Sequence, residues 1–566
     1  MKKNAVTQLF IVLGIAVVIN IMAAFLYTRL DLTNEKRYTL SQNTKQLVKK
    51  LDDVLFIKVY LSGEDLPNEL KKLSQSIEDL LNELRLASGN NIEYEFINPS
   101  QNKDQTATED FFKELYQKGL EPNDVSIREN DGMKRKVIFP GALMYYKGKE
   151  VAVNFLKSKG SDLQNEQLIN HSEEGLEYEI ANALKKIIST DKPKIAFISG
   201  NRQLNKKETF DMAYILAEYY DVSMYDIAKI EAIPSEFKTI VIAKPDSTFS
   251  EWHKFKIDHY LMNGGRILWC IDQLTAEMDS MKPADAAFMA YAKDLNIDDQ
   301  LFKYGIRINP YLVQDLKSSK IPVTIGNMGG RPQIELFSWF YFPIIAPTSK
   351  HPIVKNIDPI RLEFANTIDL IETNANTRAT VLLQTSPQTK VLFAPVRVNL
   401  GLVKDPPNVS QFDGGSQNVA VLVEGSFTSL YKNRAMGSSA QKALDSLGIK
   451  TLENSKPTKM IVVADGDILK NYTSKANKVY PVGYDRFTKR LYGNKTFIQN
   501  AIDYLCDDTG LIAIRAKEIT LRLLDKQKIK TNKIRYQVLN MGLPIVLLLL
   551  FGLIYNYRRK KQFTRR

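Results

Sequence analysis

Cys270 is the residue whose type and position come closest to covalent chemistry in this sequence of 566 residues. It lies in the apolar run 266–271, which predicts a strand, and a thiol at a strand end in an α/β sheet can act as a nucleophile. Its apolar neighbours Leu268 and Trp269 are equally typical of a buried packing residue. No histidine nearby in the sequence offers itself as a base. A nucleophile and a core thiol therefore both remain open for Cys270.

Metal and cofactor chemistry is not expected from the composition. Two cysteines, Cys270 and Cys506, are too few for a multi-thiolate zinc site, and a disulfide between them is left open. His253 and His259, two of only four histidines, lie six positions apart on one predicted helix, about 240° around its axis, so they cannot share a metal. The GxxxxGKS/T, GxSxG and HExxH motifs are absent. We predict no catalytic residue, no metal site and no cofactor.

Small and polar residues follow the predicted strands of the central region. Strands at 194–199, 239–243 and 266–271 alternate with helices, which is typical of a doubly wound parallel sheet. Ligands of such sheets bind beyond the carboxyl ends of the strands. The sequence therefore predicts a candidate ligand crevice at those ends, formed by Gly200, Asn201, Lys244, Asp246 and Asp272.

Two further acids follow a predicted strand at 459–464 that resembles a late strand of the same sheet. Asp465 and Asp467 are candidate cation contacts, because carboxylates are common ligands of hard cations. Acids that form a turn at a strand end are the alternative explanation.

Two uncharged segments near the ends predict transmembrane helices, although the mean hydropathy of the chain is only -0.24. Residues 9–27 and 538–557 are each long enough to cross about 30 Å of hydrocarbon. We favour an uncleaved anchor over a secretory signal for the first segment, because it lacks a convincing cleavage site. Helix packing inside the membrane depends on small and polar residues, and the candidates are Gly14, Asn20, Asn540 and Gly542.

The basic tail at 558–566 decides the predicted topology, because its six Lys and Arg residues resist translocation. We therefore expect the tail and residues 1–8 in the cytoplasm and the body between the spans outside it. Eight of the net +13 charges lie at these two ends, so no nucleic-acid-binding surface is expected. The basic amphipathic segment 511–537 suits contact with anionic headgroups of the phospholipid bilayer or, equally, a solvated helical stalk.

The predicted body is an α/β protein with several domains. Residues 28–190 predict an N-terminal α/β domain with a β-α-β unit, and 191–310 predict the first part of the doubly wound sheet. Residues 311–456 are β-rich and irregular, and we expect them to form a subdomain inserted into that sheet. Residues 457–510 then complete the sheet.

Several segments resemble the GldG family of gliding-motility proteins: 31–41, 338–345, 351–357, 419–434 and 492–525, in this order between two terminal spans. The resemblance implies an inner-membrane protein of Bacteroidota that acts as the auxiliary, substrate-binding component of an ABC transporter. It also implies that residues 191–310 are related to class I glutamine-amidotransferase-like folds. The Cys-His pair of amidotransferases is not evident here, which argues against enzymatic activity.

Three functions follow as hypotheses. The first is a non-catalytic accessory subunit that pairs with ABC permease and ATPase subunits and binds a periplasmic protein or carbohydrate ligand. The second is a periplasmic amidotransferase-like hydrolase that uses Cys270. The third is a structural anchor to the cell envelope without a ligand pocket.

Overall fold

The computed structural model describes most of the chain between residues 39 and 563. The described residues are 11, 13–15, 17–18, 39–63, 66–100, 105–129, 132–156, 166–189, 191–281, 287–328, 330–372, 376–404, 407–434, 448, 450–516 and 526–563. They divide into two units, Met1–Lys517 and Glu518–Arg566.

The N-terminal part of the first unit is a mixed sheet covered by helices, with strand order β2-β1-β5-β6. Its strands are β1 (Leu55–Val59), β2 (Ile92–Phe96), β5 (Gly141–Tyr146) and β6 (Lys149–Asn154), and a separate hairpin joins β3 (Asn123–Glu129) to β4 (Gly132–Ile138). Its helices are α2 (Gln42–Val48), α3 (Asn68–Ala87), α4 (Gln105–Gln117) and α5 (Glu166–Ile188). β1 and β2 are parallel and are joined through α3, which confirms the predicted β-α-β unit.

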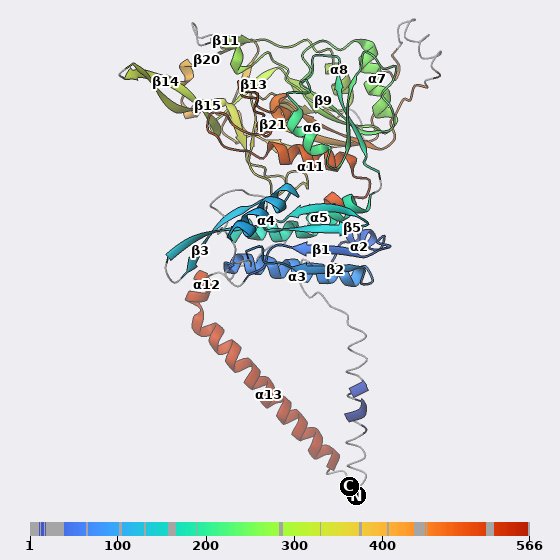
Figure 1. The fold of residues 1–566 in the computed structure, drawn as a ribbon, viewed down its shortest axis with the longest axis vertical. Coiled ribbons are helices and arrows are strands. Elements are labelled where there is room, and N and C mark those ends of the chain that lie inside the picture. The colour runs from blue at the N-terminus through green and yellow to red at the C-terminus, as the bar shows by residue number, and fades with distance from the viewer. Residues whose placement is uncertain are drawn as a thin grey trace. The chain divides into compact units, whose positions relative to one another are not determined.

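The central part of the first unit is built on a seven-stranded sheet of order β18-β21-β22-β10-β9-β7-β8 (Figure 1). The strands are β7 (Lys194–Ser199), β8 (Asp221–Asp226), β9 (Phe237–Ala243), β10 (Arg266–Cys270), β18 (Thr377–Gln384), β21 (Asn418–Gly425) and β22 (Thr458–Val463). The five from β22 to β8 are parallel, β21 pairs antiparallel with β22, and β18 pairs antiparallel with β21. The prediction of parallel strands alternating with helices is confirmed for this part of the sheet.

Both faces of the central sheet are buried, which explains why its inner strands read as continuous apolar runs. Alternate side chains of β10 enter different cores: Leu268 packs with residues of α6 (Phe210–Leu216) and α11 (Asn494–Cys506). Trp269 packs on the other face with residues of α7 (Glu251–Met262). The side chain of Ser250 caps α7 by accepting a hydrogen bond from the amide of His253.

The region 311–456 is not solely an insertion outside the central sheet. It contributes the strands β18 and β21 to the central sheet. β21 pairs with β22, in a register that places Ala420 opposite Val463 and Gly425 opposite Thr458, and β18 pairs with β21. The remaining strands make small sheets: β11 (Ala287–Ala290), β12 (Ile306–Asn309), β13 (Tyr311–Asp315), β14 (Ser318–Met328), β15 (Arg331–Ile345), β16 (Ile360–Arg361), β17 (Thr367–Leu370), β19 (Thr389–Phe393) and β20 (Val396–Asn399). Short helices complete this part: η1 (Met278–Ser280), α8 (Asp298–Lys303), α9 (Gly401–Lys404), η2 (Val409–Gln411) and η3 (Asp467–Leu469).

The expected juxtamembrane segment 511–537 does not begin as a membrane-surface helix. Residues Leu511–Ala516 form the short helix η4, and Leu511, Ile512 and Ile514 are buried in the core of the N-terminal part. The structure differs from the expectation because burying these apolar side chains in a protein core is more favourable than leaving them in the polar headgroup region.

The second unit contains α12 (Lys526–Thr531) and α13 (Lys533–Phe563). Within the described part of the chain, Lys533–Lys561 is the one helix long and apolar enough to cross a membrane. It contains the predicted second span with Asn540 and Gly542. Of the predicted first span, residues 11, 13–15 and 17–18 are helical, including Gly14, whereas Asn20 lies outside the described residues.

Candidate functional site

Lys244 is the centre of a buried ionic cluster at the carboxyl edge of the central sheet. It follows β9, beside the ends of β10 and β22, and its side chain is only 6% exposed. Its Nζ lies 2.7 Å from Oδ2 and 2.8 Å from Oδ1 of Asp467, and 3.5 Å from Oδ2 of Asp272. Glu277 completes the set at 2.9 Å. Predicted residues from three separate strand ends therefore meet around one ammonium.

The backbone of this cluster is held in an unusual conformation. Lys244 has a φ of 50°, a region in which a side chain other than glycine is uncommon. Gly466 lies so close that an added Cβ would be 2.6 Å from Cγ of Lys244 and 2.9 Å from Oδ2 of Asp272. Its amide donates a 2.5 Å hydrogen bond to Oδ1 of Asp272. Residues in such conformations persist where the surrounding structure holds them, and they concentrate at functional sites.

The acids of the cluster differ in protonation. Burial would raise the pKa of Asp467, but the ammonium groups of Lys244 and Lys470 hold it below its usual range. Burial raises the pKa of Asp272 to about 6 despite the attraction of Lys244. Burial, together with the charges of Asp272 and Asp467, raises the pKa of Asp465 well above its usual range. Burial thus works against the ionisation of Asp465, whereas Lys244 and Lys470 favour the ionised form of Asp467.

Both carboxylate oxygens of Asp465, a predicted cation contact with Asp467, accept hydrogen bonds from backbone amides. Oδ1 of Asp465 accepts from the amide of Asp467 at 2.8 Å, and Oδ2 accepts from the amide of Glu363 at 2.7 Å. The cations that Asp467 contacts are the ammonium groups of Lys244 and Lys470. Among the described residues there is no group of three or more His, Cys, Asp or Glu that could hold a metal ion.

A cavity of about 470 Å³ opens over the cluster. Lys244, Asp465 and Asp467 form part of its wall, and the segments 205–208, 277–279, 361–363 and 470–494 form the rest. Its size falls within the roughly 300–1,000 Å³ typical of small-molecule sites. This cavity lies where ligands bind in open α/β sheets.

Arg361 is a buried cation in the wall of this cavity, with a relative exposure of 8%. Its Nη1 donates to Oε1 of Glu363 at 2.5 Å, and its guanidinium lies 4.4 Å from the ring centre of Phe342. Its Nε has no hydrogen-bond partner, because Oδ2 of Asp485 is 3.8 Å away. A buried donor without an acceptor is costly, by about 1–3 kcal/mol, which makes Arg361 a point where a ligand atom could bind.

Aromatic side chains from one loop form another part of the wall. Tyr472, Tyr484 and Phe487 line the cavity. The ring of Tyr484 stacks on that of Tyr480 with centres 4.5 Å apart. The guanidinium of Arg486 lies 5.5 Å from the ring centre of Tyr472 and 4.8 Å from that of Phe487.

The other predicted crevice residues lie at the neighbouring strand end but do not line this cavity. The amide of Asp246 donates to the carbonyl of Asn201 at 3.0 Å, and the carboxylate of Asp246 lies 2.9 Å from Nζ of Lys293. The side chain of Asn201 contacts Nδ1 of His253 at 3.1 Å and donates to the carbonyl of Thr248. Gly200, with a φ of 114°, lies against Asp226. These contacts brace the loop after β9.

Both cysteines are free and buried, so the disulfide that the sequence left open does not form. Cys270 is completely buried in β10, and burial with the nearby charges of Asp465 and Asp272 raises the pKa of its thiol well above the usual value. The thiol of Cys506 lies 3.3 Å from Oγ1 of Thr239. The surroundings of Cys270 are those of a packing residue, because an effective nucleophile is an accessible thiolate.

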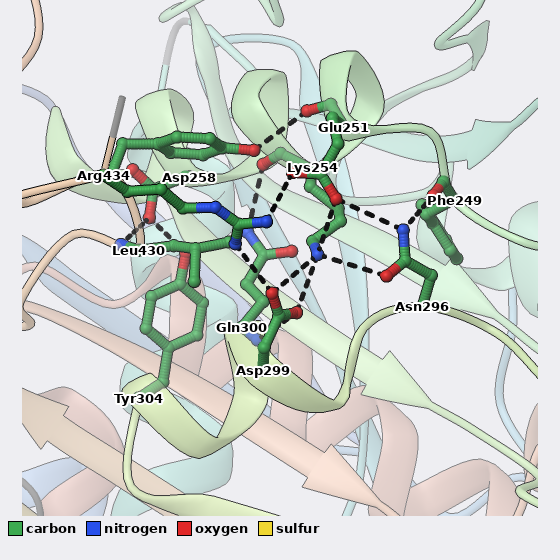
Figure 2. A network of polar contacts seen from close by, with 11 residues as sticks. Phe249, Glu251, Lys254, Asp258, Asn296, Asp299, Gln300, Tyr304, Leu430 and Arg434 are labelled. Atoms are coloured by element: carbon green, nitrogen blue, oxygen red, sulfur yellow. Dashed lines mark hydrogen bonds and ion pairs between the residues drawn. The ribbon is translucent and has the colours of Figure 1, made fainter. Parts of the chain in front are cut away.

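A second ionic network fastens residues 426–434 to α7 and α8 (Figure 2). The fully buried Lys254 places its ammonium 2.7 Å from Oδ1 of Asp299 and 3.1 Å from Oε1 of Glu251. Arg434 binds the same two acids at 2.8 and 3.1 Å. Asp258 accepts from the hydroxyl of Tyr304 at 2.7 Å. The cations here are matched by acids, which is typical of a structural clamp.

Sequence reasoning missed much of the cavity wall, including Glu277, Arg361, Glu363, Lys470 and Asp485. These residues come from irregular segments and the edges of short elements, where no periodic pattern marks a shared surface. The pairing of Arg361 with Asp485 joins residues 124 positions apart, and nothing in a single sequence signals it.

One of the comparisons with known proteins, a family model, connects the chain with a transport system. Residues 192–501 match the model of a protein family described as an ABC-type uncharacterized transport system, and residues 34–145 match a domain of unknown function. An uncharacterized protein of Borreliella burgdorferi is 21% identical over 99% of both chains. Among solved structures, the mmIFT52 N-terminal domain is 14% identical and covers 55% of this chain and 96% of its own, with a TM-score of 0.29, too low to show a shared fold.

Proposed function

Because the chain belongs to the family of ABC-type uncharacterized transport systems, as an auxiliary component, we propose that it is a non-catalytic accessory subunit with a ligand site. In this proposal the ligand binds in the cavity at the carboxyl edge of the central sheet. Separate permease and ATPase subunits carry out translocation and ATP hydrolysis.

The cavity over Lys244 is the observation that carries the proposal. It lies within the part of the chain that the family model matches, and its wall combines buried charges with aromatic rings. The one thiol close to this edge, Cys270, is fully buried, which favours binding over nucleophilic chemistry.

The membrane arrangement is part of the same proposal. The helix Lys533–Lys561 would cross the bacterial inner membrane, with residues 558–566 in the cytoplasm beside the ATPase. The first span at 9–27 would place the N-terminus on the same side and the body in the periplasm. The resemblance of residues 492–525 and other segments to gliding-motility proteins supports a role in gliding of a Bacteroidota cell.

Affinity purification from native membranes tests this proposal. The full chain, tagged at its C-terminus, should retain a multi-span permease and an ATPase after detergent extraction without crosslinking. A tagged inner-membrane protein of unrelated function with two spans is the control. Recovery of neither subunit with the full chain, under conditions that keep a known ABC transporter intact, would contradict the accessory role.

A further inference from the structure

We propose that the cavity over Lys244 binds a neutral, hydroxyl-rich ring, which is the chemistry of a carbohydrate of one or two sugar units. This inference rests on the proposed ligand-binding function and assigns the class of the ligand.

The first argument is the balance of charge in the cavity wall. Its cationic side chains are Lys207, Lys244, Arg361, Lys470 and Arg486. Its acidic side chains are Glu208, Glu277, Asp279, Glu363, Asp465, Asp467 and Asp485. Five cations face seven acids, so the wall offers no excess of positive charge to an anionic ligand.

The second argument is that four of the five cations, Lys244, Arg361, Lys470 and Arg486, lie within 4 Å of an acid of the wall. Lys244 binds Asp467 and Glu277, and Lys470 lies 3.7 Å from Glu208 and 3.5 Å from Asp467. An anionic or cationic ligand would have to separate such a pair and leave one of its members without its counter-charge, which is costly in a partly buried site.

A sugar hydroxyl avoids that cost. It can donate to a carboxylate and accept from an ammonium or guanidinium at the same time, so both ions stay paired with each other. Hydrogen bonds to charged groups are stronger than those between neutral groups. A wall of paired acids and cations therefore offers acceptors and donors side by side to the hydroxyl groups of a polyol.

Arg361 supplies the most specific polar contact. Its Nε lacks an acceptor although the residue is nine-tenths buried, and the residue lines the cavity. A hydroxyl oxygen at this position would complete the hydrogen bonding of the guanidinium without disturbing its bond to Glu363.

The aromatic part of the wall supplies the complementary apolar contact. One face of a sugar ring carries C–H groups, and aromatic rings provide apolar surface for them. Tyr484 is half-buried, lines the cavity and is supported by stacking on Tyr480, so its ring has a defined orientation. Tyr472 and Phe487 extend this surface from the same loop.

Saturation-transfer NMR on the detergent-solubilised full chain tests the inference. The probes are glucose, galactose, mannose, N-acetylglucosamine, maltose and cellobiose at millimolar concentration, with glucose 6-phosphate and glutamate as charged comparators. We expect at least one neutral sugar to show transfer to its ring protons, and neither comparator to bind more tightly than it.

Two variants tie binding to the cavity. Tyr484→Ala removes the stacking surface, and Arg361→Lys keeps the charge but removes the Nε donor, so each should weaken sugar binding by about tenfold. The matched controls are Tyr214→Ala, at a tyrosine that is 72% exposed on α6, and Arg434→Lys in the network of Figure 2. Both controls should bind like the wild type, and melting curves without sugar show whether each variant is folded.

Two results would overturn the inference: transfer to none of the neutral sugars, or sugar binding that folded Tyr484→Ala and Arg361→Lys leave unchanged. If the permease and ATPase still co-purify in that case, only the ligand class is wrong. If sugar binds as expected but neither subunit co-purifies, the transport role is wrong and the site assignment holds.

Discussion

The ammonium of Lys244 lies 2.7 Å from Oδ2 of Asp467, although 223 positions separate the two residues in the chain. The contact joins the ends of β9 and β22, which are separated in the sheet by β10. It is the ionic link that closes the carboxyl edge of the central sheet below the cavity.

Replacing Lys244 by Met should strongly destabilise the central part of the first unit. The change leaves Asp467 and Asp272 buried without their cation, and removing one partner of a buried pair costs about 3–5 kcal/mol. All three tryptophans, Trp252, Trp269 and Trp339, lie in this part, so their fluorescence during urea unfolding reports on it. Lys194→Met is the control, because its exposed pair with Glu236 contributes about 0–1 kcal/mol. Equal unfolding midpoints for the two variants would contradict the structural role of Lys244.

Asp272 should make the central part less stable as the pH rises. Its pKa is about 6 in the folded chain, against a usual 3.8, so its contribution is fully present below about pH 4 and is lost as the pH passes through 6. Asp272→Asn cannot ionise. The free energy of unfolding of the wild type relative to this variant should therefore fall by about 3 kcal/mol between about pH 4 and pH 7.

Asp508→Asn provides a control of opposite sign for that titration. The hydrogen bonds of Arg266 and Lys238 hold the pKa of Asp508 below its usual range despite partial burial. Its contribution to stability is present above about pH 4 and is lost on acidification. A wild-type advantage over Asp272→Asn that stays constant or grows with pH would show that folding does not raise the pKa of Asp272.

Gly466→Ala should disrupt the cluster by steric overlap. A methyl group there would lie 2.6 Å from Cγ and 2.8 Å from Cβ of Lys244, so the strand ends must move apart. We expect the free energy of unfolding to fall by about 1–3 kcal/mol. Urea unfolding monitored by tryptophan fluorescence measures this change. Gly175→Ala is the control, because a methyl group in α5 at Gly175 meets nothing within 4 Å and should be neutral or stabilising. Similar losses in both variants would indicate that close approach at Gly466 is not the cause.

The repeated strand and helix pattern of the central sheet was predictable from the sequence because its periodicity is strong. The strand at 239–243 and the helix from Ser250 to Met262 agree with β9 and α7 to within a few residues. β8 was not predicted, because its sequence DVSMYD is polar and only half-buried at a sheet edge. Nor was the addition of β21 to β22, since a single sequence carries no signal for pairing across an intervening loop.

The sequence predicted those residues of the candidate site that follow parallel strands. It did not predict those that come from segments without a regular strand or helix pattern. Lys244, Asp272 and Asp467 could be named because residues after adjacent parallel strands meet at one edge. Arg361 follows no periodic pattern. Lys254 was missed for a different reason. Its helix has no distinct polar face, so the sequence pattern does not indicate which of its polar residues are buried. Lys254 is fully buried, and its ammonium pairs with Asp299.

Cys270→Ala should leave the proposed accessory function intact. The thiol is completely buried and its pKa is raised, so it is held as an unreactive thiol. In a Cys506→Ala background, Cys270 should react with dithionitrobenzoic acid only after unfolding in urea. The Cys270→Ala chain should co-purify with the permease and ATPase as well as the wild type does. Fast labelling of native Cys270, together with loss of function in the alanine variant, would instead favour the hydrolase hypothesis.

Reporter fusions should place the body and the C-terminal tail on opposite sides of the membrane. The C-terminal tail, residues 558–566, carries six basic residues, and such a segment resists translocation. Alkaline phosphatase, which folds only in an oxidising compartment, should therefore be active when fused after residue 190 and inactive when fused after Arg566. Neutralising Arg558, Arg559, Lys560 and Lys561 should weaken this preference, whereas neutralising Lys526, Lys528 and Lys530 on the other flank should strengthen it. An active fusion at the tail with an inactive fusion in the body would reverse the topology and remove the periplasmic role.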